Sequence, residues 1–414
     1  MNKDPFCGPF EADQLETFIA KGVNPAAVLP NLTQYEQAST NLEYNLCDAH
    51  SHQWQDPTQL DVIPLLPSIY LRSACGRQHD IEAEFQRTFF GLAGQHSMRT
   101  SPYRLLSNCA SASIDIVATY LGARNMSVGL LQPCIDAQVM ILRQRKVRLI
   151  PIAESMLAHR TLDASLLNLL TGENRPDALL ITLPNNPTGF ALDQTEFEFL
   201  AHTCKATGTL LIIDWAFRFY ESYETWDQYA ILNEIGVEYV CIEDTGKTWP
   251  TLNQKCSILV ASPRLYPDLR ELHNNVTLYV SPLVLCLLTA YLADSQERGL
   301  DSTVRDLIRT NRDVLHQALS GSVLAPATAD RTGVSVEWIR IESADLTGPD
   351  LADLVRNFGI GILPGDFFYW ADPQAGSYHV RFALAREATH FALACRLLRS
   401  LIAATPRLRS AGAA

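Results

Sequence analysis

Four polar side chains that can do covalent or acid–base chemistry stand next to apolar runs, in a fixed order along the chain. Asn186 lies in the stretch LPNNPTG, Asp214 ends the run TLLIID, Lys247 follows VEYVCIEDTG, and Arg381 lies in YHVRFALAR. An amine at a strand end can condense with a carbonyl group, and a guanidinium can bind a carboxylate bidentately. Each stretch alone is common, since Asn-Pro-Thr-Gly is an ordinary turn. The ordered set indicates a single site.

This set predicts a site for pyridoxal 5'-phosphate (PLP). PLP needs an amine with which to form an imine, and Lys247 would supply it at the carboxyl edge of a sheet. Asp214 would keep the pyridine nitrogen protonated, which makes the ring an electron sink, and Asn186 would bind the phenolate oxygen of the ring. Arg381 would bind the carboxylate of an α-amino acid. We therefore expect Lys247 and Asp214 to be catalytic residues.

The cofactor phosphate requires backbone donors at the start of a helix and a nearby cation. In the stretch LSNCASASIDI, a strand gives way to a helix at Ala110, Ser111 and Ser113. Lys255 follows Lys247 at a distance of eight residues. We expect Ala110, Ser111 and Lys255 to bind the phosphate.

The elements that must position these residues alternate along the chain. Apolar runs are separated by longer amphipathic stretches, a pattern typical of a mostly parallel sheet covered by helices. The predicted strands are Tyr103–Leu106, Val128–Leu131, Val147–Ile152, Ala178–Leu183, Thr209–Ile213, Val237–Ile242 and Cys256–Val260. A helix is predicted over Asp193–Thr207, because Asp193 can cap it, Glu196 completes a capping box, and Gly208 can end it.

The pattern predicts an α/β protein of three parts. Residues 1–60 are polar and weakly periodic, and we interpret them as an arm or lid over the active site. Residues 61–290 form the predicted large domain. Residues 291–414 form a smaller α+β domain, with a short strand pair near Gly359–Leu363 and Tyr378–Leu384.

Composition excludes several other classes of protein. The chain has 414 residues, 47% of them hydrophobic, and a formal net charge of −12, which argues against a non-specific nucleic-acid binder. The one basic run, Arg143 to Arg148, is interpreted as a solvated helix end that leads into a strand. The N-terminus has no apolar core typical of a signal peptide, and no run is long enough to span a membrane, so we expect a cytoplasmic enzyme. The ten cysteines lack paired spacings and are interpreted as buried free thiols.

Three alternative motifs are incomplete. Gly246-Lys247-Thr248 resembles the end of a phosphate-binding loop, but Cys241 stands where that motif has glycine. The glycines at 359, 361 and 365 have the wrong spacing for a dinucleotide fingerprint. His50 and His52 could ligate a metal, but nothing near them in the sequence completes a site, and we expect none.

These motifs resemble those of fold-type I PLP enzymes, the aminotransferase class I/II group, over most of the chain. The stretch Asn31–His50 (NLTQYEQASTNLEYNLCDAH), with IEDTGKTWPTL and VSPLVL, is similar to PLP-dependent, oxygen-consuming L-arginine oxidases and hydroxylases of antibiotic pathways. The resemblance implies that the N-terminal segment folds over bound L-arginine. It also implies a homodimer with shared active sites, in which Asn274–Pro282 reaches the partner.

The resemblance assigns further residues to the substrate and the cofactor. Thr33, Glu36, Asp48 and His50 match its substrate-binding positions, and Glu36 and Asp48 would pair with the guanidinium group. Asp244 stands where ordinary aminotransferases commonly have a phosphate-binding serine. Because a carboxylate repels a phosphate, Asp244 is expected to face a cationic substrate. Ala216 and Ile135 are also expected at the cofactor, with Ile135 at a position that is usually aromatic.

The implied reaction consumes dioxygen as co-substrate, releases peroxide and gives 2-ketoarginine and its 4-hydroxy derivative. His50 is expected to steer water or protons near the substrate side chain, since imidazole titrates close to neutrality. The alternatives are an arginine desaturase, an ordinary aminotransferase for a basic amino acid, a cyclase acting on hydroxyarginine, and a catalytically silent PLP-fold regulator. No DNA-binding segment is recognised in the sequence, and the four polar residues are all present, which disfavours the regulator.

Overall fold

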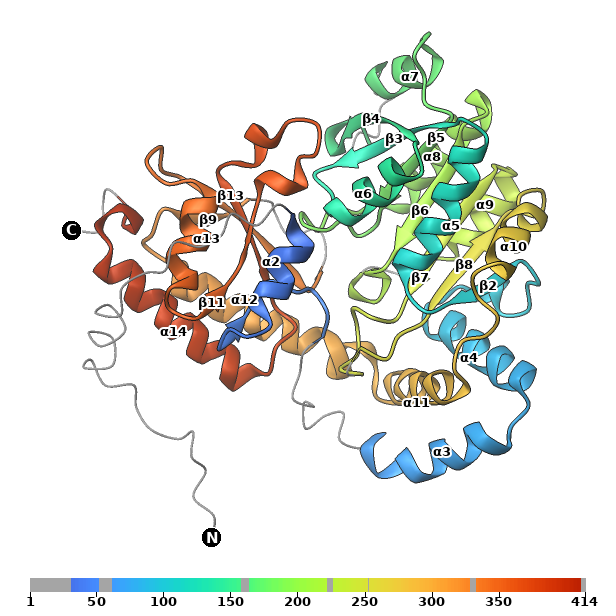
Figure 1. The fold of residues 1–414 in the computed structure, drawn as a ribbon, viewed down its shortest axis with the longest axis horizontal. Helices are drawn as coiled ribbons and strands as arrows, with labels where there is room; N and C mark the ends of the chain where they lie inside the picture. Colours follow the sequence, from blue (N-terminus) through green and yellow to red (C-terminus); the bar gives the residue numbers. More distant parts are fainter. Residues whose placement is uncertain are drawn as a thin grey trace.

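The computed structural model describes most of the chain. The described residues are 31–51, 62–157, 164–221, 226–251, 253–327 and 333–410. Residues 1–30 and His52, which belong to the predicted arm and to the incomplete histidine pair, lie outside them. In Figure 1 a large sheet with its helices lies beside a smaller, C-terminal group of strands and helices.

The large sheet has seven strands and carries the site residues at strand ends. In spatial order the strands are β2 (Arg104–Ser107), β8 (Ser257–Ala261), β7 (Tyr239–Asp244), β6 (Leu210–Trp215), β5 (Ala178–Thr182), β3 (Ser127–Gln132) and β4 (Arg148–Ala153). Only β8 runs antiparallel to its neighbours, β2 and β7. All seven predicted runs form strands, and the predicted α/β fold with a mostly parallel sheet is confirmed.

Helices cover both faces of this sheet because its strands are apolar on both sides. Ile212 of β6 belongs to a cluster with α5 (Ala110–Ala123), α6 (Asp136–Gln144) and α10 (Tyr266–Asn274). Its neighbour Ile213 faces the opposite cluster, with α8 (Gln194–Thr207) and α9 (Gln228–Ile235). Full burial of one such side chain stabilises the fold by roughly 1.5–3 kcal/mol. The two clusters therefore fix which side chains of each strand face which layer of helices.

Helix α8 confirms the predicted helix and shows why it begins and ends where it does. The Asp193 carboxylate accepts from the backbone nitrogen of Glu196 at 2.8 Å, and the Glu196 carboxylate accepts from that of Asp193 at 3.0 Å. Gly208 ends the helix in the left-handed conformation, with φ of 69°.

The C-terminal part contains a four-stranded sheet and three long helices. The antiparallel strands are, in order, β12 (Leu363–Pro364), β13 (His379–Ala383), β10 (Val336–Ile341) and β9 (Leu324–Pro326). The helices are α12 (Asp306–Leu319), α13 (Gly348–Arg356) and α14 (Ala388–Ala404). The predicted strand pair is found in part: β13 lies within Tyr378–Leu384, but of Gly359–Leu363 only Leu363 belongs to β12, and Ile360–Gly361 pairs with the N-terminal segment instead. Helix α11 (Pro282–Arg298) runs through the expected boundary at residue 290 and contacts α3 (Leu66–Cys75) and α4 (Gln78–Leu92) beside the large sheet.

The segment 31–51 is built into the C-terminal part. β1 (Tyr44–Asn45) pairs in parallel with β11 (Ile360–Gly361), and the backbone nitrogen of Ala383 donates to Leu46 at 2.8 Å. Before β1, helix α2 (Leu32–Ser39) places Tyr35 against Phe367, with ring centroids 5.7 Å apart. In Figure 1 this segment lies against the small sheet on the side that faces the large one. The segment is therefore packed on the C-terminal part through specific backbone and side-chain contacts.

Two other expectations concern cysteines and membranes. Of the nine cysteines in the described ranges, Cys75 is exposed and Cys109 is half-buried, so the expectation that all are buried is wrong at these positions. Both lie near helix ends, where packing is incomplete. Among the described residues, none of the helices combines the length and the apolarity that crossing a membrane requires.

Candidate active site

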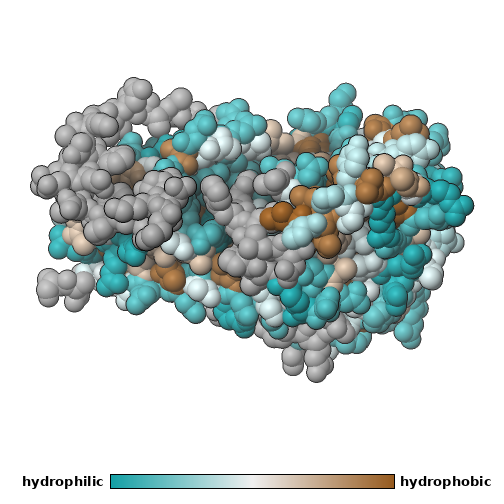
Figure 2. Space-filling model, turned by 90° about the horizontal axis from the view of Figure 1, so that it is seen from below, coloured by the Kyte–Doolittle hydropathy of each residue, from teal (hydrophilic) through white to brown (hydrophobic). Residues whose placement is uncertain are grey.

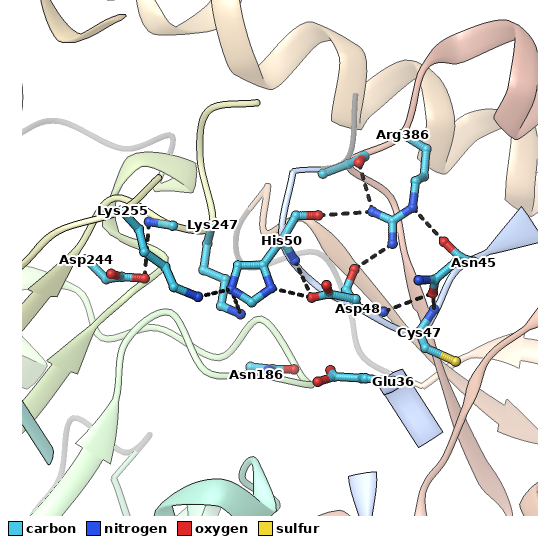
Figure 3. A network of polar contacts seen from close by, with 12 residues as sticks. Glu36, Asn45, Cys47, Asp48, His50, Asn186, Asp244, Lys247, Lys255 and Arg386 are labelled. Atoms are coloured by element: carbon cyan, nitrogen blue, oxygen red, sulfur yellow. Dashed lines mark hydrogen bonds and ion pairs between the residues drawn. The ribbon is translucent and has the colours of Figure 1, made fainter. Parts of the chain in front are cut away.

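Lys247 lies in the loop that follows β7, where the two parts of the molecule meet. The hydroxyl of Tyr220 donates to its backbone oxygen at 2.7 Å, which holds the loop. Its Nζ atom lies 3.3 Å from Nε2 of His50, a residue of the N-terminal segment. Nζ of Lys255 lies 3.1 Å from the same nitrogen. Figure 3 shows both ammonium groups directed at the one imidazole.

His50 is held by Asp48. Its Nδ1 lies 2.5 Å from Oδ1 of Asp48, and its backbone nitrogen donates to the same oxygen at 2.9 Å. With Nδ1 donating to Asp48, Nε2 carries no proton and can accept from an ammonium group. The charge of Lys247, together with burial, lowers the pKa of His50 to about 4, despite the opposing effect of Asp48. The imidazole is therefore neutral near physiological pH and acts as a hydrogen-bond acceptor.

Asp214 ends β6 and is buried beneath the site. Its Oδ2 accepts from Nε2 of Gln138 at 2.7 Å, and its Oδ1 accepts from the backbone nitrogen of Ala216 at 3.0 Å. Burial raises the pKa of Asp214 to about 6, and the nearby Asp244 adds to this, against the lowering effect of the hydrogen bonds and Lys247. A cationic ring nitrogen would compensate the buried charge. Ala216 thus acts through its backbone, on Asp214.

Gln138 is a site residue that the sequence did not indicate. It lies in α6, is buried, and also contacts Oγ1 of Thr182 at 3.0 Å. Its amide therefore joins the ends of β5 and β6 to the helix that starts after Ile135. No spacing or motif distinguishes this glutamine from others in the chain.

Asn186 and Arg381 lie next to each other although they are far apart in sequence. Nη1 of Arg381 donates to Oδ1 of Asn186 at 3.0 Å, and Nη2 lies 3.4 Å from Oε1 of Glu36 and also donates to the backbone oxygen of Cys47. Arg381 is fully buried, and burial lowers its pKa. Burial raises the pKa of Glu36 against the opposing charge of Arg381. The guanidinium of Arg381, which is predicted to bind the carboxylate of the substrate, thus already lies beside the carboxylate of Glu36.

Asp244, at the end of β7, is buried beside the lysine loop. Its Oδ2 accepts from the backbone nitrogen of Gly246 at 3.2 Å, whereas its Oδ1 has no hydrogen-bond partner among the described residues. A Cβ at Gly246 would lie 2.9 Å from Cδ of Lys255 and 3.0 Å from Oδ2 of Asp244, so a larger residue there would push these two side chains aside. Burial raises the pKa of Asp244, while Lys247 and Lys255 lower it. A buried carboxylate oxygen is destabilising without a donor, and a cationic ligand could supply one.

The start of α5 lies next to these groups. Oγ of Ser113, in its first turn, lies 2.9 Å from Oγ of Ser257, which follows Lys255 by two residues and pairs with Asp244 across β7 and β8. Ala110 and Ser111 are the first residues of that helix. The helix N-terminus and Lys255 thus offer an anion the donors and positive charge that a phosphate needs.

Two predicted residues have weaker connections to this group. Ile135 precedes α6 and is half-buried against the apolar cluster to which Leu32 and Tyr35 of α2 belong. Thr33 is exposed on α2, one turn before Glu36. A second residue missed by sequence reasoning, Arg386, is buried and bonded to the backbone around Asp48. The motif YHVRFALAR contains it, but nothing there separates its role from that of Arg381.

The residues present fit a PLP cofactor. The described part of the chain supplies an amine, a buried carboxylate below it, an amide, a second lysine and a helix N-terminus, all around the carboxyl edge of one sheet. Asp214 alone would be costly at neutral pH, because a buried carboxylate without a cationic partner is destabilising. Among the described residues no group of three or more histidine, cysteine or acidic side chains could hold a metal ion.

Comparisons with known proteins agree with this chemistry. A family model described as aminotransferase class I and II matches residues 100–388. A structure of MppP soaked with the product 2-ketoarginine is 31% identical, covers 86% of this chain and 99% of that one, and has a TM-score of 0.79. No curated protein matches the sequence.

Other solved structures show the fold alone. YbdL from Escherichia coli, for which a methionine aminotransferase function has been identified, is 18% identical over 92% of this chain and all of that one, with a TM-score of 0.71. N-succinyldiaminopimelate aminotransferase from Mycobacterium tuberculosis is 17% identical over 91% of this chain and 100% of that one, also with a TM-score of 0.71.

Proposed function

The chain belongs to the aminotransferase class I and II family of PLP-dependent enzymes, and we propose that it oxidises free L-arginine with dioxygen. Oxidation of the α-amine to a ketone passes an electron pair to dioxygen, which leaves as peroxide. Water supplies the keto oxygen, and the nitrogen leaves as ammonia. Loss of a second electron pair to dioxygen and addition of a second water would give the 4-hydroxy product.

The observation that carries this proposal is the set of acids around the lysine. Asp244 has a buried oxygen with no partner among the described residues, and Glu36 and Asp48 lie close enough to influence each other and Lys247 electrostatically. A substrate with a neutral side chain would bring no donor to Oδ1 of Asp244, which lacks one among the described residues, and would offer Glu36 no cation besides Arg381. A guanidinium has five donors in a planar fork and satisfies carboxylates bidentately.

Each residue then has a definite task. When bound, PLP supplies an aldehyde that forms imines with amines and an electron-poor ring that stabilises negative charge at the α-carbon. Lys247 Nζ, freed by the substrate amine, would take the α-proton. Asp214, held by Gln138, would keep the proton on the ring nitrogen. Arg381 would bind the α-carboxylate, and Asn186, which it contacts, would orient the ring oxygen.

His50 is the candidate for chemistry on the side chain of the substrate. Its neutral Nε2 lies 3.3 Å from Nζ of Lys247 and can accept or pass a proton between that amine and a water molecule. We infer that this group governs whether water adds at C4. An arginine desaturase, in which no water adds at C4, would use all the other residues named here in the same roles.

The experiment that tests the oxidase is an oxygen-electrode measurement with the PLP-loaded protein and L-arginine, without any keto acid. Oxygen uptake with stoichiometric peroxide and a 2-keto product by mass spectrometry is the expected result. Norleucine, which has no guanidinium, is the matched control and should be consumed poorly. Turnover that depends on an added keto acid would instead identify an aminotransferase for a basic amino acid.

We also propose that two copies of the chain form a dimer with shared sites. Val276, Leu278 and Tyr279, which lie in the predicted loop Asn274–Pro282, are 68%, 81% and 62% exposed. Leu66, Tyr70 and Leu71 of α3 are exposed as well. Figure 2 views the molecule from the side of α3 and α11 and shows apolar side chains gathered there. Such a patch exceeds what isolated surface residues explain and suits a second copy as its occupant.

A further inference from the structure

Arg386 lies just after β13, and its guanidinium is buried within the N-terminal segment. Nε donates to the backbone oxygen of Asn45 at 2.6 Å, Nη2 to that of Asp48 at 2.6 Å, and Nη1 to those of His50 at 3.0 Å and Ala385 at 2.9 Å. Figure 3 shows this guanidinium enclosed by the turn that carries Asp48 and His50. Three of its four acceptors thus belong to one short segment.

A cation in such a place is costly. Burial lowers the pKa of Arg386 to about 10, against the opposing effect of the nearby Asp48 carboxylate. The backbone of the segment 45–50 would be left with several buried carbonyl oxygens if this side chain were absent, since a buried unpaired carbonyl is destabilising. Only a guanidinium can reach three carbonyl groups at fixed angles from one side chain.

A second buried arginine extends the same arrangement. Arg381 donates to the backbone oxygen of Cys47, so the carbonyl groups of residues 45, 47, 48 and 50 all accept from these two side chains. Arg381 also contacts Asn186 and Glu36, as described above. The hydrogen bonds of Arg386 go to backbone oxygen atoms of this segment and of Ala385, so its effect on the site runs through the position of the segment.

The position of this segment affects Lys247 through two contacts, one between Asp48 and His50 and one between His50 and Lys247. The segment presents His50 with its backbone nitrogen and its Nδ1 both bonded to Asp48, and this leaves Nε2 at 3.3 Å from Nζ of Lys247 and 3.1 Å from that of Lys255. A shift of the turn by one ångström would break these contacts, because hydrogen bonds weaken steeply with distance and angle. The ammonium groups of Lys247 and Lys255 and the carboxylate of Asp48 are the charged groups that face His50.

We propose that Arg386 is a positioning residue, which fixes the segment 45–50 so that the Asp48–His50 pair meets the amine of Lys247. The inference rests on the proposed role of Lys247 as the PLP lysine. In this proposal the guanidinium of Arg386 binds the protein's own backbone. The C-terminal part of the molecule, which lies across from the sheet that carries Lys247, thereby sets the position of His50.

The test compares Arg386→Met, Arg386→Lys, His50→Ala and the double variant Arg386→Met/His50→Ala as PLP-loaded proteins. The measured quantity is the pH midpoint of the absorbance change of the cofactor attached to Lys247. Removing an acceptor from a protonated nitrogen disfavours the protonated form, so His50→Ala should lower the midpoint by about one pH unit. Arg386→Met should lower it by a similar amount, Arg386→Lys by less, and the double variant by no more than His50→Ala.

Arg312→Lys is the matched control, because Arg312 is a buried arginine of the same part of the molecule that bonds Glu337 and does not touch the segment. It should leave the midpoint unchanged. Hydrogen exchange of the cofactor-free protein gives an independent measurement: the amides of Tyr44 and Leu46, bonded to Gly359 and Gly361 at 2.9 Å, should exchange faster in both Arg386 variants and not in the control.

An unmoved midpoint in Arg386→Met, or shifts of Arg386→Met and His50→Ala that add in the double variant, would overturn the proposal. Should Arg386→Met fail to fold, Arg386→Lys and its exchange pattern decide the question in the same way. Failure of the underlying function looks different. In that case the wild-type protein would show no titrating band, or the band would persist in Lys247→Ala.

Discussion

The buried carboxylate of Asp214 makes the cofactor-free protein less stable at neutral pH than its packing would allow. Burial raises its pKa to about 6, above the value of about 3.9 in an unfolded chain. The folded state therefore binds its proton more tightly between these values, and stability falls as the pH rises through this window. At pH values above the pKa of Asp214 in the folded protein, the full cost of its buried charge reduces the free energy of unfolding.

Replacing Asp214 by Asn removes this charge and should raise the melting temperature of the cofactor-free protein near neutral pH. The gain should be about 2–3 kcal/mol at roughly pH 7 and should vanish at pH values below about 4. Thermal melting of both proteins across this pH range is the measurement. Equal stability at all pH values would contradict the assignment of a strained buried charge. The same variant should bind PLP weakly, because the ring nitrogen loses its counter-ion.

Glu36 and Arg381 form an ion pair, and a substrate with two charged ends would have to break this pair and bind each of the two residues instead. Oε1 of Glu36 lies 3.4 Å from Nη2 of Arg381, the group proposed to take the substrate carboxylate. L-Arginine would form two new ion pairs, one between its α-carboxylate and Arg381 and one between its guanidinium and Glu36. Norleucine could form only the pair with Arg381. Glu36 therefore competes with any ligand that carries a carboxylate alone.

Glu36→Gln should weaken arginine binding on the order of 10²-fold, the scale of unpairing a buried charge, and should tighten norleucine binding several-fold. Both affinities can be measured from the absorbance of the PLP-loaded protein. Glu43→Gln, an exposed substitution in the same segment, is the control and should change neither. Weaker binding of both ligands by Glu36→Gln would speak against competition.

At the scale of elements, the sequence was informative where a residue's role follows from its place in one strand. Asp214 and Lys247 were found because parallel strands bring their carboxyl ends to one edge, so a charged residue after an apolar run points to a site. Gln138 and Arg386 escaped because their partners lie 76 and more than 300 residues away. Their roles depend on how helices and segments are placed in space, which periodicity does not encode.

The N-terminal segment is the element for which sequence pattern was least informative. Its polar composition suggested an arm, yet α2 and β1 are docked on the C-terminal sheet. The docking depends on a few contacts: Tyr35 lies under the guanidinium of Arg356 at 4.8 Å, and the backbone nitrogen of Leu32 donates to Asp136 at 2.8 Å. Of the three buried side chains in the eight residues of α2, only Leu32 and Tyr35 are apolar, which is too few to give a periodic signal.

Removal of the Tyr35 ring should therefore loosen α2 without disturbing the lysine loop. Tyr35→Ala is expected to cost about 3–5 kcal/mol of local docking, by analogy with other large-to-small core substitutions. KM for arginine should rise while the cofactor absorbance stays the same, since α2 carries Glu36. Gln37→Ala, exposed on the same helix, is the control. A changed absorbance with an unchanged KM would assign α2 to the cofactor instead.

At the scale of the whole molecule, the apolar surface formed by the loop Asn274–Pro282 and α3 requires an explanation. Leu278 and Tyr279 are exposed although the remainder of the loop is anchored by His273, which is buried and bonds the backbone oxygen of Leu106 at 2.7 Å. The anchoring holds the loop in place while its apolar side chains point outward. Apolar side chains exposed on a loop that is held in this way are typical of a protein–protein contact.

Leu278→Asp should convert the proposed dimer to a monomer, because a charge buried at an apolar interface without a partner costs several kcal/mol. Multi-angle light scattering should show the halved mass, and arginine oxidation should fall with it if the sites borrow residues from the partner. Leu167→Asp, which places the same charge at a less exposed position on α7 (Ala164–Thr171), should leave mass and activity unchanged. A wild-type protein that is monomeric and fully active would mean that each chain builds its site alone, and the exposed loop would then need another partner.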